Sequence, residues 1–232
     1  MTAGRTPSGR ARVRWCLVAI AALAVTSGLS PDASAGDLRG VSRWITVGGI
    51  GGATQLDAAL QDYRWQTGAR PTWGVQALAG QGRWSAGLRA WQAWTTQSTG
   101  IPGETAIPEV RLASIGAVGR VRLAAVGGVE LMAIASAGRL HLGWHPDRAT
   151  YDLAGVGEPV VIHYEPVDTW LWGAGMAFRR SIGRRLLAGA SMEHLRFDLE
   201  TAHRAGDAIA VQRETFGNWS LRLELSWIVR QS

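Results

Sequence analysis

Three neighbouring residues, Ser191, Glu193 and His194, carry the functional groups that a serine hydrolase uses. A serine hydroxyl becomes a nucleophile when an imidazole accepts its proton and a carboxylate orients that imidazole. The apolar residues from Leu186 to Met192 alternate with small or polar ones, which predicts a β-strand. On this strand Ser191 and Glu193 share a face, and a change of phase at His194 indicates a β-bulge. We therefore expect structural roles here and no catalytic site.

The histidines and the cysteine offer no metal site. His141 and His145 are four residues apart, but on a strand this spacing brings two side chains together only loosely. The single cysteine, Cys16, excludes a disulfide scaffold and a Cys-rich zinc site. The sequence also contains no phosphate-binding loop and no H-E-x-x-H motif. We expect no metal and no cofactor.

Charged residues within the alternating segments predict an ion-pair network. Glu193 with Arg196, and Arg222 with Glu224, belong to the last two predicted strands, which we expect to be neighbours. Arg89 occupies the polar face of an earlier strand. Because a buried charge needs a partner, these five side chains are expected to pair in the interior and plug it. A narrow pore with charged walls is the alternative interpretation.

Apolar and polar residues alternate with a period of two, and this pattern predicts the strands that must position these side chains. It is clearest in the C-terminal segment, where apolar residues from Trp219 to Val229 alternate with mainly polar ones. Similar segments indicate eight strands, over residues 43–53, 73–80, 84–91, 110–123, 129–144, 170–179, 186–200 and 219–230.

The predicted connections alternate in length. Short glycine-containing turns occupy 80–83, 125–128 and 180–184, whereas long connections occupy 54–70, 95–109, 145–168 and 201–218. In an up-and-down meander, one rim then carries short turns and the other carries long loops. Helical spacing from Leu56 to Tyr63 predicts a short helix in the first loop.

The first 35 residues form a predicted signal peptide. Four arginines precede an 11-residue apolar stretch, Trp15–Val25, and Ala33-Ser34-Ala35 is a cleavage signal. Its removal leaves one domain over 36–232. The formal net charge of the 232-residue chain, +6, then falls to +3. Export and this lower charge argue against nucleic-acid binding, although every basic residue is arginine.

Tryptophans mark the ends of several apolar faces, which favours a lipid-facing sheet. Aromatic rings border the apolar band of membrane barrels, and a sheet in lipid must close to satisfy its backbone. An eight-stranded barrel has an interior just wide enough for side chains to fill it. The residues expected in the aromatic girdle are Trp73, Trp84, Trp170, Trp172, Trp219 and Trp227.

On these features the chain resembles the small eight-stranded outer-membrane barrels, the OmpA- and OmpX-like group. The resemblance covers roughly 42–230 and implies an all-β, eight-stranded antiparallel up-and-down transmembrane barrel in the outer membrane of a Gram-negative bacterium. It implies a monomer with a structural or surface-interaction role, contacts to outer-membrane lipid and lipopolysaccharide, and a surface ligand held by the long loops. Chains of that group usually end on an aromatic residue, whereas this chain ends five residues after Trp227.

Two other functions stay open at this stage. The first is a lipid A-modifying outer-membrane enzyme, which needs a Ser/His/acid set facing lipid. Barrels that deacylate lipid A carry a histidine two residues before the serine, and that order is absent here. The second is a soluble periplasmic barrel that binds an apolar ligand. It would enclose Leu221, Leu223 and Leu225 and expose Arg222 and Glu224 to water.

Overall fold

The computed structural model describes residues 43–100, 107–151, 159–205 and 208–231. The predicted signal peptide, residues 1–35, lies outside the described residues. The elements in chain order are β1 Trp44–Gln55, η2 Ala58–Tyr63, β2 Ala69–Gln81, β3 Trp84–Thr96, β4 Glu109–Val126, β5 Val129–His145, β6 Arg148–Tyr151, β7 Val160–His163, β8 Val167–Ser181, β9 Leu186–Ala205 and β10 Ala208–Gln231.

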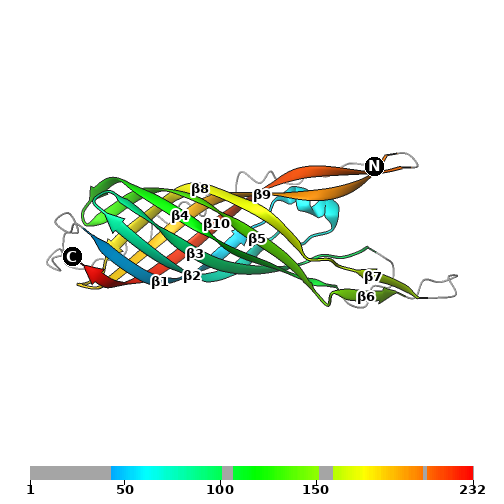
Figure 1. The fold of residues 1–232 in the computed structure, drawn as a ribbon, viewed down its shortest axis with the longest axis horizontal. Helices are drawn as coiled ribbons and strands as arrows, with labels where there is room; N and C mark the ends of the chain where they lie inside the picture. Colours follow the sequence, from blue (N-terminus) through cyan, green and yellow to red (C-terminus); the bar gives the residue numbers. More distant parts are fainter. Residues whose placement is uncertain (1–42, 101–106, 152–158, 206–207, 232) are drawn as a thin grey trace, which may run out of the picture. The chain divides into compact units, whose positions relative to one another are not determined.

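Eight of the described strands close into a barrel, in the order β1-β10-β9-β8-β5-β4-β3-β2 (Figure 1). Each pair of neighbours is antiparallel, and β1 pairs with both β10 and β2, which closes the ring. The predicted eight-stranded antiparallel up-and-down barrel is therefore confirmed. Closure gives every strand two partners, so the barrel itself has no edge.

Short turns join the strands at one rim. Gly127 and Gly128 both have positive φ, 58° and 79°, between β4 and β5. A two-residue hairpin that follows the twist of its strands needs this conformation, which glycine adopts without steric cost. The predicted short helix of the first loop is present as the 3-10 helix η2. No helix among the described residues is long and apolar enough to cross a membrane.

Two of the predicted long loops contain more structure than expected. Between β5 and β8, strands β6 and β7 pair as a separate hairpin. The segment 201–218, expected as a loop, is mostly strand, because β9 continues to Ala205 and β10 begins at Ala208. Figure 1 shows these two strands side by side in orange and red. Among the described residues, much of the long-loop rim is thus built from paired backbone.

The bulge predicted at Glu193–His194 is wrong. The pairing of β9 with β10 runs without a shift from Leu186 to Ala205. Ser191, Glu193, Leu195 and Phe197 all face the interior. The sequence pattern changes phase because the interior-facing side chains of β9 change character there. Ser191 and Glu193 are polar, whereas Leu195 and Phe197 are apolar.

Candidate functional site

The barrel interior contains a layer of ion pairs at mid-height, called here the lumen network. It joins strands on opposite sides of the ring, because β3 lies opposite β9 and β4 lies opposite β10. Its members, all largely withdrawn from solvent, are Gln76, Arg89, Arg120, Ser136, Glu193, Arg222 and Glu224.

Glu193 is the acceptor in one half of the lumen network. Its Oε1 accepts hydrogen bonds from Nη1 of Arg89 and from Nη1 of Arg222, the latter at 3.2 Å. Its Oε2 accepts a hydrogen bond from the Ser136 hydroxyl at 3.1 Å. The guanidinium of Arg222 also lies over the ring of Trp91, 5.1 Å from its centroid. These contacts connect β3, β5, β9 and β10 through one carboxylate.

Glu224 is the acceptor in the other half. Arg120 donates to it through Nη1 and Nη2, both at 2.8 Å, in a bidentate pair. Gln76 donates to the same carboxylate at 3.1 Å and accepts from Arg120 at 2.9 Å. The three side chains form a closed triangle in which the two charges neutralise each other.

Four of the five residues expected in a charged interior lie there, namely Arg89, Glu193, Arg222 and Glu224. Arg196 does not, and its prediction is corrected. It follows Leu195, which faces the interior, so its side chain points outward and is exposed. Adjacent strand residues face opposite sides, and without a bulge Arg196 cannot share the face of Glu193.

Three members of the lumen network were not predicted from the sequence: Gln76, Arg120 and Ser136. Each lies on the buried face of an alternating strand, and Arg120 shares its face with Ser114 and Val118. That periodicity is a signal for burial. It does not identify Glu224, four strands away around the ring, as the partner.

A second charged cluster lines the interior near the short-turn rim. Glu130 accepts hydrogen bonds from Arg122 at 2.9 Å and from Nη2 of Arg179 at 2.7 Å. The guanidinium of Arg179 lies 4.7 Å from the ring centroid of Trp44. An apolar layer that includes Trp44, Val118 and Met132 lies in the same part of the interior.

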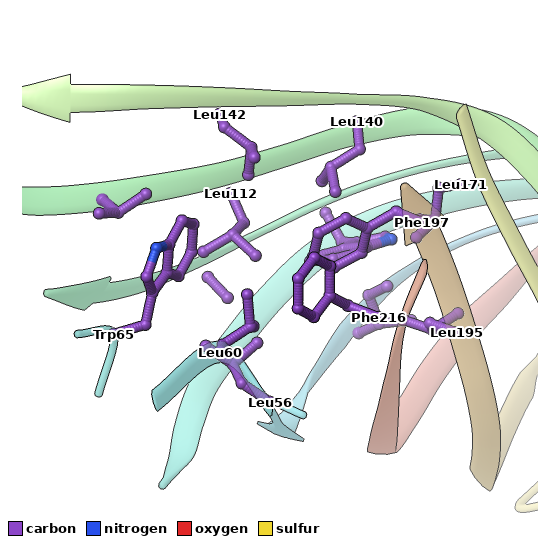
Figure 2. Packing of buried hydrophobic residues seen from close by; sticks show 14 residues of the cluster. Leu56, Leu60, Trp65, Leu112, Leu140, Leu142, Leu171, Leu195, Phe197 and Phe216 are labelled. Atoms are coloured by element: carbon purple, nitrogen blue, oxygen red, sulfur yellow. The ribbon is translucent and has the colours of Figure 1, made fainter. Parts of the chain in front are cut away.

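Apolar side chains fill the interior toward the long-loop rim (Figure 2). The first loop contributes Leu56, Leu60 and Trp65, which pack with leucines of β4 and β5 and with Phe197 and Phe216. Leu60 of η2 is completely buried. We call this group the loop-end core.

Hydrogen bonds hold η2 against β10. The carboxylate of Asp57 caps η2 by accepting from the Ala59 amide at 3.0 Å, and it also accepts from the Gly217 amide at 2.6 Å. The hydroxyl of Tyr63 donates to Glu214 at 2.7 Å. Desolvation of the Tyr63 hydroxyl, together with the Glu214 carboxylate, raises the pKa of Tyr63.

The outer surface carries an apolar belt between two rows of tryptophan. The six tryptophans expected in a girdle are 48–69% exposed. Trp84 and Trp227 lie toward the short turns, whereas Trp73, Trp170, Trp172 and Trp219 lie toward the loops. Exposed apolar side chains between the rows include Val47, Val75, Leu88, Ile115, Met176, Leu223 and Leu225.

Basic residues mark the loop-side border of this belt. Arg139 pairs in register with Trp170 and lies over its ring at 5.2 Å, and Arg196 pairs in register with Trp172.

The height of the belt matches that of a membrane barrel. Trp84 and Trp94 are ten residues apart on β3. At about 3.3 Å per residue and a tilt of about 40°, they are separated by roughly 25 Å along the barrel axis, the height of the apolar band in membrane barrels.

The hydrolase-like trio does not converge. Ser191 is buried in the interior, and Glu193 is held there by two arginines. His194 points to the opposite side of the wall, where its ring lies 4.8 Å from that of Trp219. No group of three His, Cys, Asp or Glu side chains could hold a metal ion within the described ranges.

Comparison with known proteins adds similarity of fold at low sequence identity. The chain is similar to small outer-membrane barrels of known structure. Neisserial surface protein A shares 9% identity with a TM-score of 0.45, covering 80% of this chain and 96% of that one. OprG from Pseudomonas aeruginosa shares 10% identity with a TM-score of 0.45, covering 82% and 97%.

Ail, the attachment invasion locus protein of Yersinia pestis, shares 14% identity with a TM-score of 0.38, covering 80% of this chain and 98% of that one. No family model matches the sequence, and no curated protein matches it.

Proposed function

We propose that this chain is an integral barrel of the bacterial outer membrane with a closed lumen and a structural or surface-interaction role. The observation that carries the proposal is the exposed apolar belt between two tryptophan rows around a charged interior. On β10, Leu223 and Leu225 are exposed while Arg222 and Glu224 are buried. A water-soluble barrel around an apolar ligand needs the reverse arrangement, because exposed apolar area is unfavourable in water.

Fractionation tests the location. We expect the protein in the detergent-extracted outer-membrane fraction, with a gel mobility that changes on heating as the barrel unfolds. Recovery in the soluble periplasm without detergent would contradict the proposal.

The closed lumen is supported by two separate layers. The lumen network spans the interior at mid-height, and the loop-end core packs above it. Planar bilayers containing the purified protein should show no stepwise conductance. Regular single-channel steps would instead support the pore with charged walls.

The same proposal assigns the outer membrane's anionic lipids as partners, including lipopolysaccharide. Arg139 and Arg196 are exposed beside girdle tryptophans, at the level where headgroups meet an apolar band. Replacing both by glutamine should weaken lipopolysaccharide retention during purification, whereas the same change at Arg230, an exposed arginine near the short-turn rim, should not. Equal retention by both variants would remove this part of the proposal.

The rim opposite the short turns is the proposed surface for a further ligand. The β6–β7 hairpin, η2 and the extended β9–β10 pair present side chains on a hydrogen-bonded scaffold, and loops held on a rigid scaffold are where binding residues are commonly found.

The proposal includes a monomer, no nucleic-acid partner, no cofactor and no catalysis. Unchanged lipid A in cells that express the protein, compared with cells expressing Ser191→Ala, would agree with the absence of lipid A modification.

A further inference from the structure

The buried charges at mid-height do not balance. Among the described residues, this layer contains three guanidinium groups, of Arg89, Arg120 and Arg222, and two carboxylates, of Glu193 and Glu224. Arg120 and Glu224 form a neutral bidentate pair. Arg89 and Arg222 instead share a single oxygen of Glu193. The group made by Arg89, Arg222 and Glu193 thus carries one net positive charge.

Arg89 also has N–H groups that make no hydrogen bond. Its Nε and Nη2 are buried and have no hydrogen-bond partner within the described part of the chain. A buried charged donor left unpaired is costly, so these two N–H groups favour an acceptor beside them. Glu193 accepts from Nη1 of Arg89, from Arg222 and from Ser136, but it accepts from neither of these two N–H groups.

A small cavity lies beside this guanidinium. It has a volume of about 20 Å³, and Arg89, Trp91, Ser114, Gly116 and Gly138 are among the residues that line it. Gly116 is the register partner of both Arg89 and Gly138. A Cβ on Gly116 would lie 2.6 Å from the Cα of Gly138, so side chains are excluded here. Such a volume accommodates one particle of about the size of water.

We propose that this cavity binds one monovalent anion of halide size, for which chloride is the natural candidate. The anion would accept from Nε and Nη2 of Arg89 and from the hydroxyl of Ser114. Water could accept the same hydrogen bonds, but only an anion also balances the net charge. Phosphate and other polyatomic anions are too large for the cavity.

Anomalous diffraction from crystals of the detergent-purified protein soaked in bromide tests the site directly. We expect a bromide peak within hydrogen-bonding distance of the Arg89 guanidinium. The absence of a peak there would overturn the proposal, and this measurement needs no variant to fold.

Urea unfolding in chloride or gluconate at equal ionic strength tests the energetic role. Above the dissociation constant, each tenfold rise in chloride should lower the unfolding constant by about tenfold. Arg89→Gln, which removes the excess charge, and Ser114→Asp, which supplies a fixed carboxylate, should both abolish this dependence. Arg230→Gln, a change of the same charge at an exposed position near the short-turn rim, should retain it.

Equal chloride dependence in the natural chain and in Arg89→Gln would contradict the proposal. A bromide peak without chloride-dependent stability would mark an adventitious ion only, and would contradict it as well.

Discussion

Arg120 on β4 and Glu224 on β10 form a bidentate ion pair across the full width of the barrel, with both N···O distances at 2.8 Å. Their strands are four positions apart in either direction around the ring of described strands. Arg89 and Glu193 connect β3 and β9 in the same way. The lumen network therefore braces opposite walls of the barrel as well as adjacent strands.

Glu224→Gln should destabilise the barrel strongly, because it leaves the buried Arg120 without its counter-charge. Removing one partner of a buried pair costs about 3–5 kcal/mol. Urea unfolding in phospholipid vesicles measures the loss. The double variant Arg120→Gln, Glu224→Gln should lose less than the sum of the single variants, since no charge is then left unpaired. Glu165→Gln, at an exposed position, should change stability by no more than about 0.5 kcal/mol. Additive single losses would show that the two side chains are not coupled.

An arginine introduced on the outer face should have an effect that depends on height. Leu223 lies midway between Trp219 and Trp227, so Leu223→Arg should cost about 2–4 kcal/mol, the value for the bilayer midplane. Val211 has the same outward phase on β10 beyond the belt, and Val211→Arg should cost at most about 1 kcal/mol. Comparison of the two unfolding free energies in vesicles checks this. Equal costs at the two positions would contradict the assignment of the belt.

Leu60→Ala should loosen η2 from the loop-end core. Leu60 is fully buried, and truncation of a buried leucine costs about 2–5 kcal/mol. Hydrogen exchange of the amides in 58–65 should become faster, while the barrel strands keep their protection. Asp62→Ala, on the exposed side of η2, is the matched control and should leave exchange unchanged. Unchanged protection in Leu60→Ala would mean that η2 is held by its hydrogen bonds alone.

The sequence predicted the barrel because alternation reports which side of a wall each residue occupies. It failed where the polarity of both sides changes along one strand. On β9 the interior becomes apolar at Leu195, just where the exterior becomes polar at Arg196. If the interior face of β9 is assumed to stay polar along its whole length, the pattern predicts a bulge at Glu193–His194 and places Arg196 in the interior. The structure has no such bulge, and Arg196 is exposed.

The alternation of apolar and polar residues does not predict which interior side chains pair with each other. Alternation gives the face of Arg120 but not the register that brings it opposite Glu224. The segment 201–218 predicts a loop because its apolar residues no longer alternate regularly with polar ones, while the backbone pairing of β9 with β10 continues through it.

The central claim is that the outer belt faces lipid, and site-directed spin labelling tests it most directly. The single cysteine of the chain, Cys16, lies in the predicted signal peptide, so a cysteine at position 223 can be labelled uniquely in the mature protein. With the barrel in vesicles, a nitroxide at 223 should collide frequently with oxygen and rarely with a water-soluble nickel chelate, and a nitroxide at 211 should show the reverse. A label at 223 that is readily reached by the nickel chelate would contradict the account.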